Sequence, residues 1–232
     1  MFLRPHTTTI LAALVSLTSV TTVEAQTPTP QGPRPHVPTG YLLIEEEQWD
    51  MLSDEPSRHL SRARDAFLIM DARTAAAEMR KAAVHVRVAA EHALDRSKRS
   101  LTHSEHELEQ TARRIETGMV KSVEDLDLVT ARALHALAND QYARASDAWR
   151  KRELKRSGQF LRSATNNLER AAARTDATMR AATAEVAKDS RVISGKLIEG
   201  TGFVMDEIGA GLETVGHQIE KVGSRVLPHP PK

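Results

Sequence analysis

Apolar side chains recur at steps of three, four or seven residues from about residue 57 to residue 198. This period places them on one face of an α-helix that packs along a seam. The pattern predicts four helices: one that begins near Pro56, and three over roughly 73–117, 122–152 and 155–198. We therefore expect an all-α fold, an elongated antiparallel bundle of long helices. Within residues 41–198, the helices pair as two related hairpins, about 57–117 and 122–198.

Residues that break helices are rare in the same region. No proline occurs from Ser57 to Leu227, and Gly118 and Gly158 are the only glycines within residues 57–194. Proline costs about 3 kcal/mol inside a helix and glycine about 1 kcal/mol, whereas sheet proteins use both residues in their turns. The scarcity of both residues strengthens the helical prediction.

The carboxyl-terminal part has a second pattern, with glycine at every seventh residue from Gly195 to Gly223. Apolar residues fill two further columns of the same heptad, like the a and d positions of a coiled coil. They include Met205, Ile208, Leu212, Val215, Ile219 and Val222. We expect an amphipathic helix over 199–227 and a short tail over 228–232. The glycines would let this helix approach another backbone closely. The alternatives are packing on the bundle, on a second copy or on a membrane surface; the polar face is not cationic, which favours the first two.

Two segments of the chain align when one is shifted onto the other: Arg62-Ala-x-Asp-Ala-Phe67 matches Arg144-Ala-x-Asp-Ala-Trp149. Self-similarity of this kind is typical of internal repeats. We expect a duplicated helical hairpin, with its turn near 70–73 in one copy and near 152–155 in the other.

The turn resembles that of a tetratricopeptide repeat in the residues Phe67-Leu-Ile-Met-Asp71, Ala75 and Lys81-Ala82. Met70 and Arg152 stand where that family places glycine, and the two copies are much farther apart than the tetratricopeptide period. We therefore expect one similar turn in each half and no tandem array.

Other segments resemble a group of uncharacterised exported bacterial helical proteins. The residues that carry this resemblance are Tyr41–Trp49, Asp54–His59, Ala63–Phe67 and Glu78–Ala83. The resemblance implies a helical, exported protein and brings no activity with it.

Residues 1–25 are typical of an export signal. Arg4 supplies the positive end, residues 10–20 form a short apolar run, and Val23-Glu-Ala25 fits a cleavage site. The run is about half of the roughly 20 residues that a membrane span needs. Five prolines follow within residues 26–40, which favours an extended tether. We expect a periplasmic or secreted protein that is cleaved after Ala25.

The composition excludes several kinds of chemistry. The chain has no cysteine, 3% aromatic residues and a formal net charge of +1. Disulfides and thiolate chemistry are therefore excluded, and nucleic-acid binding is not expected. The chain also lacks a glycine-rich phosphate loop, H-E-x-x-H and G-x-S-x-G. We expect a protein that is not an enzyme and has neither a cofactor nor a small-molecule substrate.

Histidine is the residue type most suggestive of a ligand site. His85, His92 and His103 share one face of the predicted second helix, and His106 lies about 60° away. His103 and His106 are one turn apart, and Glu107 follows His103 at the fourth position, which gives a candidate metal site. The stripe lies away from the apolar seam. We interpret it as a solvated face and keep metal or haem binding as an alternative.

Charge is uneven around the second predicted turn. The basic residues there are Arg150, Lys151, Arg152, Lys155 and Arg156. Residues 45–55, in contrast, contain six acidic residues and no basic one. The basic turn fits anionic lipid or another polyanion. It also fits docking of the acidic segment or an ordinary solvated face, and we favour these two interpretations.

We therefore expect a non-enzymatic, exported helical bundle that acts as a scaffold or protein-interaction module in the cell envelope. It would act through a protein partner or by self-association. One alternative is an amphipathic protein that binds membrane surfaces through residues 196–226 and the basic turn. The other alternative is a metal- or haem-binding bundle.

Overall fold

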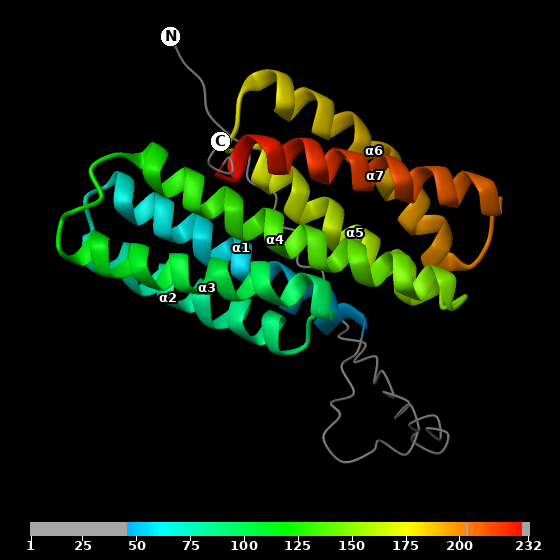
Figure 1. Ribbon diagram of the computed structural model, residues 1–232, viewed down its shortest axis with the longest axis horizontal. Coiled ribbons are helices and arrows are strands. Elements are labelled where there is room, and N and C mark those ends of the chain that lie inside the picture. The colour runs from blue at the N-terminus through cyan, green and yellow to red at the C-terminus, as the bar shows by residue number, and fades with distance from the viewer. Residues whose placement is uncertain (1–45, 203, 229–232) are drawn as a thin grey trace, which may run out of the picture. The chain divides into compact units, whose positions relative to one another are not determined.

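The computed structural model describes residues 46–202 and 204–228, with the backbone alone over 46–53. The predicted signal peptide (1–25), the proline-rich linker (26–40) and nearly all of the predicted tail (228–232) lie outside the described residues. The described part contains seven α-helices and no strand, which confirms the all-α prediction. The helices are α1 (Glu46–Leu68), α2 (Ala72–Glu91), α3 (Asp95–Glu116), α4 (Val123–Arg150), α5 (Leu154–Ala172), α6 (Ala177–Glu199) and α7 (Met205–Val226) (Figure 1).

Two of the predicted long helices are each broken into two. The helix expected over 73–117 is α2 and α3, and the helix expected over 155–198 is α5 and α6. Each later helix has a starting signal: the Asp176 carboxylate accepts the Met179 N–H at 2.9 Å, and Asp95 lies in the first turn of α3. The pattern of apolar residues continues through the turns between α2 and α3 and between α5 and α6. Alanine is accommodated in a helix, in a turn and in a close contact, so it does not mark these turns.

The first helix is longer than expected. It begins at Glu46 and carries Pro56 inside it. A proline within a helix removes one backbone hydrogen bond but keeps a helical φ, so the helix continues where neighbouring contacts compensate. Here Arg170 of α5 donates to Asp54 at 2.7 Å and to Ser57 at 2.5 Å. These bonds hold the segment around the proline against α5.

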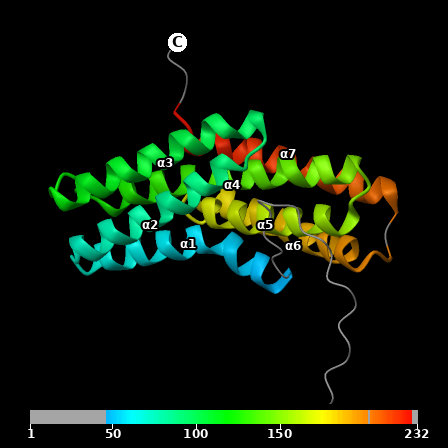
Figure 2. The ribbon, with the colours of Figure 1, turned by 90° about the horizontal axis from the view of Figure 1, so that it is seen from below.

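Helix α4 lies at the centre of the bundle. It contacts α1, α2, α3, α5 and α7, and Figures 1 and 2 show it running between the other helices. Its buried apolar residues are Leu126, Val129, Ala131, Ala133, Leu134, Ala136, Leu137, Ala138, Ala143, Ala145 and Ala148. A helix that buries residues all around its circumference belongs to the core. The rest of the bundle is therefore assembled around α4.

The helix boundaries recur at the same offset that separates Arg62 from Arg144. Leu68 and Arg150 end α1 and α4, and the helices that follow begin at Ala72 and Leu154. The starts of α3 and α6 are separated by this offset as well. We term α1–α3 the first half and α4–α6 the second half, and we call positions at this offset matching positions. The corresponding unit is three helices rather than the predicted two-helix hairpin, and the duplication itself stays a prediction.

The turns that follow α1 and α4 have the same backbone geometry. Met70 and Arg152 both have a φ of 64°, in the left-handed region. The Asp71 N–H donates to the Ala66 carbonyl at 2.9 Å, and the second turn has the corresponding bond. These bonds define a Schellman cap, whose left-handed position usually holds glycine. Both turns therefore place a side chain where glycine would be less strained.

Helix α7 belongs to the same compact unit as the other helices, which spans Ile44–Lys232. It packs against α4, α5 and α6. Five of its six predicted interaction residues are buried there: Ile208, Leu212, Val215, Ile219 and Val222. The sixth, Met205, is 37% exposed. The helix expected over 199–227 is α7, and of the alternatives for its apolar face the structure has packing on the bundle, where that face completes the core of the second half.

The heptad glycines have different roles. A Cβ on Gly216 would lie 2.5 Å from Tyr142 Oη, and one on Gly223 would lie 2.8 Å from His135 Nε2, so α7 approaches α4 closely at both. Gly195 and Gly209 have open space instead, and Gly202 has a φ of 70° in the connection before α7. The expected close approach is therefore correct for two of the five glycines. The other three glycines fit the heptad spacing, but no close packing accounts for them.

Candidate functional site

The structure does not bring together the metal ligands predicted on α3. His103 and His106 are exposed. Glu107 is engaged elsewhere, because its Oε1 accepts a hydrogen bond from Arg132 Nη1 at 2.5 Å. The turn before α3 also separates these residues from His85, which lies on α2. The predicted site is therefore not formed by this arrangement.

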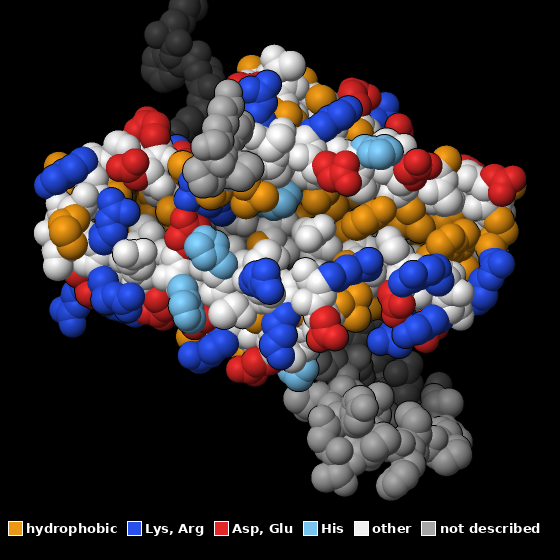
Figure 3. All heavy atoms as spheres, viewed as in Figure 1, with side chains coloured by type: hydrophobic (Ala, Val, Ile, Leu, Met, Phe, Trp, Pro, Cys, Tyr) orange, Lys and Arg blue, Asp and Glu red, His pale blue; other side chains and the backbone are white. Residues whose placement is uncertain are grey.

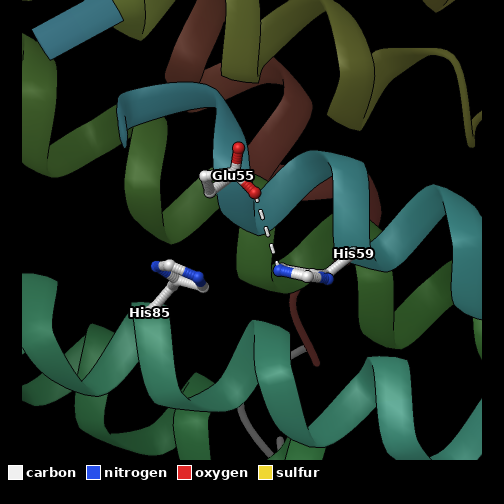
Figure 4. A group of neighbouring side chains, drawn as sticks. All are labelled: Glu55, His59 and His85. Carbon is white, nitrogen blue, oxygen red and sulfur yellow. Dashed lines mark ion pairs between the residues drawn. The ribbon is translucent and has the colours of Figure 1, made fainter. Parts of the chain in front are cut away.

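A different group of potential ligands gathers between α1 and α2. Glu55 and His59 lie one turn apart on α1, and His85 comes from α2 (Figure 4). One ligand atom from each lies within 4.8 Å of the others, and this is the one such group of three within the described residues. His59 is buried, and the other two are half-buried. The two imidazole rings stack, with centroids 5.3 Å apart. We term these three residues the histidine cluster.

His59 is held in a defined orientation by residues outside the cluster. Its Nδ1 lies 2.7 Å from Glu78 Oε2, and Lys81 Nζ donates to the other carboxylate oxygen at 2.5 Å. Burial raises the pKa of Glu78, but the hydrogen bonds from Lys81 and His59 outweigh it, so the net shift is downward. An ionised carboxylate only accepts hydrogen bonds, so the His59 Nδ1 must carry the proton. The other ring nitrogen, Nε2, then lies on the side of Glu55.

Glu55 and His85 complete the cluster from its more exposed side. Glu55 Oε1 accepts from Arg58 at 2.8 Å, while its Oε2 lies 3.6 Å from His59 Nε2. Burial lowers the pKa of His85, and the neighbouring His59 lowers it further against the attraction of Glu55. The lowered pKa favours the neutral imidazole of His85, which keeps a lone pair available.

Sequence reasoning missed this cluster because it followed one helix at a time. The spacing of Glu55 and His59 puts both on one helical face, which is a readable signal. The partner His85 lies on the next helix of the chain, and only the antiparallel packing of α1 on α2 brings it near. A search for histidines on facing sides of adjacent helices would have found it.

Three of the five basic residues of the turn pair with two carboxylates beside them. Arg150 and Lys151 both pair with Asp147, at 3.1 and 2.8 Å. Arg156 pairs with Glu153 at 2.8 Å. Arg152 lies over the Trp149 ring, 5.9 Å from its centroid. Lys155 also has an interaction partner. Paired charges at a helix end are typical of a solvated structural turn, so the geometry gives little support to a polyanion site.

The corresponding turn of the first half is apolar and exposed. Leu68, Ile69 and Met70 are 52%, 77% and 92% exposed. Met119, in the connection between α3 and α4, is 56% exposed, and Figures 1 and 2 place that connection at the same end of the bundle. We term Leu68–Met70 the apolar turn. Three consecutive exposed apolar residues are a feature of interaction surfaces rather than of solvated turns.

A pocket of about 490 Å³ lies between α4 and the end of α7. His135, Ile219 and Leu227 contribute to its lining. His135 Nε2 donates to the Ile219 carbonyl at 3.0 Å. Burial lowers the pKa of His135, and this hydrogen bond opposes the shift only in part. The hydrogen bond uses Nε2 to fasten α7 to α4, so we interpret His135 as structural. The space-filling view in Figure 3 shows the side chains exposed on this face of the molecule.

In the part of the chain that the structure describes, no helix combines the length and the apolar character that crossing a bilayer requires. Comparison with known proteins gives no match to a family profile, a curated protein or a solved structure. The two resemblances noted from the sequence therefore stay predictions.

Proposed function

We propose that the protein is a non-enzymatic, exported helical bundle that serves as a scaffold or protein-interaction module in the cell envelope, with the apolar turn as its binding surface. The amino-terminal signal pattern supports export. The observation that carries the interaction role is the exposure of Ile69 and Met70.

The conformation of Met70 adds to this argument. A residue with a side chain costs about 1–2 kcal/mol in the left-handed region, and glycine avoids that cost. Met70 has this conformation and is 92% exposed, so its side chain adds almost nothing to the core. Methionine is flexible and polarizable, which suits an adaptable binding surface. Arg152 has the same conformation, so what distinguishes Met70 is its exposed apolar side chain, and this is the feature that favours binding.

Membrane-surface binding has less support. The apolar residues of α7 that would enter a membrane are buried against the bundle, and the basic turn is paired with its own carboxylates. A protein partner for the apolar turn needs neither feature. A second copy of the chain could also be that partner.

We also infer that the two halves descend from one duplicated three-helix unit. The shared helix boundaries and the matching left-handed turn residues support this inference. Chance similarity between alanine-rich helices would not require the turns to match as well.

Site-specific photo-crosslinking tests the interaction surface. A photoreactive amino acid at Ile69 is compared with one at Lys151, the matching position in the second turn. We expect a discrete adduct in the native envelope from Ile69 and none from Lys151. An adduct from Lys151 alone would assign the role to the basic turn, and equal labelling from both would contradict the proposal.

A glycine substitution provides a second test with its own control. Met70→Gly should remove the adduct formed at Ile69 while leaving the helical circular dichroism spectrum unchanged. Arg152→Gly makes the same backbone change in the second turn and should leave the adduct intact. Light scattering on the purified chain then distinguishes a second copy from a different partner.

A further inference from the structure

We propose that the histidine cluster binds a divalent transition-metal ion of the zinc class, with Glu55, His59 and His85 as the protein ligands. The proposal rests on the placement of these three side chains and is independent of the interaction role of the apolar turn.

The ligand atoms are close enough to converge on one ion. Tetrahedral zinc holds its ligands at about 2.0–2.1 Å, which puts neighbouring ligand atoms about 3.3 Å apart. The three ligand atoms lie within 4.8 Å of one another. Figure 4 shows Glu55 and His59 on α1 and His85 on α2, with the side chains turned toward one another. Small rotations of the half-buried Glu55 and His85 would close the remaining distance without moving a helix.

The contacts around His59 are those of a metal-binding histidine. Such a histidine commonly donates its second ring N–H to a carboxylate, which fixes the tautomer and orients the ring. His59 does this with the buried Glu78 at 2.7 Å, and Lys81 balances the charge of that carboxylate. This leaves Nε2, the nitrogen that faces Glu55, as the one that would ligate the ion. A buried ion pair without a ligand role would not need the second histidine stacked beside it.

The donor set selects the kind of ion. Two imidazole nitrogens and one carboxylate oxygen suit Zn²⁺, Cu²⁺ and Ni²⁺, whereas Ca²⁺ and Mg²⁺ prefer oxygen ligands alone. Three protein ligands leave one coordination position open to water or to another molecule. The bound ion would also join α1 to α2 by a link that does not depend on hydrophobic packing.

The second half lacks this ligand set. Leu137, Gln141 and Asn167 stand at the positions that match Glu55, His59 and His85. All three are buried in helices of the same kind. We therefore expect one ion for each chain. Each residue of the second half is also a suitable substitution for testing its matching ligand, because a helix of the same kind already accommodates it at that position.

Isothermal titration of the purified full chain with zinc chloride, at pH 7.5, tests the proposal. We expect one equivalent to bind at micromolar concentration or below. His85→Asn, which installs the residue of the second half, should weaken binding at least tenfold. His103→Asn is the control, because His103 is an exposed histidine outside the cluster, and it should leave the affinity unchanged.

Two further measurements separate ligation from a folding defect. Glu78→Gln keeps the three ligands and should still weaken zinc binding, by about 10–100-fold. Co²⁺ in place of zinc should give the visible absorption of a tetrahedral site in the native chain but not in His85→Asn. Equal zinc affinity in the native chain and His85→Asn would overturn the proposal, as would a loss of binding in His103→Asn. Melting curves without metal must show that each variant folds.

Discussion

The two halves of the molecule share the end of their first helix, the starts of the next two helices and the geometry of their first turn, yet they differ in what they expose and bury. The first half exposes the apolar Leu68–Met70 turn, whereas the second half has charged residues at the same place. The first half places Glu55, His59 and His85 between its first two helices, whereas the second half has leucine and two amides at the matching positions. The difference teaches that the turns and helix ends maintain the fold while the side chains at matching positions are free to take other roles.

The halves also differ in how closely their helices pack. Ala76 in α2 is fully buried, and the matching position in α5 is Gly158. A Cβ on Gly158 would lie 2.7 Å from the Ser194 carbonyl oxygen of α6. Helix α5 therefore approaches α6 at Gly158 without room for a side chain, and α7 covers the second half as well.

The largest expected effect tests whether the halves fold as one unit. Met79 and Leu161 are fully buried at matching positions. Alanine at either site should lower the free energy of unfolding by about 2–5 kcal/mol, because a cavity remains. Chemical denaturation followed by circular dichroism should show one transition, shifted by both variants. Val192→Ala, at a site 56% exposed, should change the free energy of unfolding by less than about 0.5 kcal/mol. Two separate transitions, each moved by one variant, would mean that the halves unfold independently.

A smaller change in the free energy of unfolding should test the close approach of α5 to α6 at Gly158. Gly158→Ala should lower the free energy of unfolding by about 1–3 kcal/mol, because the added methyl meets backbone rather than a mobile side chain. Gly209→Ala is the matched control. It has nothing within 4 Å, so the better helix propensity of alanine should raise stability by up to about 1 kcal/mol. If both variants gain stability, α5 and α6 do not pack as closely as the structure indicates.

The two left-handed turns should respond alike to glycine. Met70→Gly and Arg152→Gly should each raise the free energy of unfolding by about 0.5–1 kcal/mol, because the strain of a side chain at φ 64° is removed. Met119→Gly, at a residue without positive φ, should bring no gain. Denaturation midpoints at unchanged slope provide the measurement. If the free energy of unfolding rises for only one of the two variants, the two turns are not strained equally despite their equal φ.

The smallest expected change in the free energy of unfolding appears only at acidic pH. His85 in the first half and His135 in the second both have a lowered pKa in the folded chain, caused first by burial. The unfolded chain then binds protons that the folded chain resists, so stability is fully present above about pH 6.5 and falls as the pH decreases below it. His135→Gln should flatten this fall, measured as the free energy of unfolding between pH 7.5 and pH 5. His217→Gln, at an exposed histidine paired with Glu213 and Glu220, should leave most of it unchanged.

The sequence predicted the class of fold well and the lengths of the helices poorly. The period of apolar residues identified α4 nearly to its ends, because Ser122 and Asp125 mark its start and no break follows within it. The same period ran through the turn at His92 and the one before Asp176, since alanine on both sides of a turn continues the pattern. The left-handed conformation of Met70 and Arg152 could be anticipated, because both residues stand where the tetratricopeptide turn has glycine.

The candidate sites were harder to predict, for a physical reason. A metal site or an interface depends on which faces of separate helices meet, and periodicity describes one helix at a time. His103, His106 and Glu107 satisfy a local spacing rule, but packing turns Glu107 toward Arg132. His59 and His85 satisfy no local rule together, and the packing of α1 on α2 joins them. Likewise, the heptad on α7 identified an apolar face without saying which partner would cover it.

The placement of α7 has a consequence for the order in which the molecule is completed. The last helix of the described chain supplies Ile208, Val215 and Val222 to the core and its terminal carbonyl at Val226 to Arg132 of α4. During synthesis α7 leaves the ribosome after α1–α6, so the newly made chain cannot cover its central helix until α7 has emerged. Under the export that we propose, this arrangement would suit threading through a narrow translocation channel, because the core around α4 would be completed only after α7 had been released.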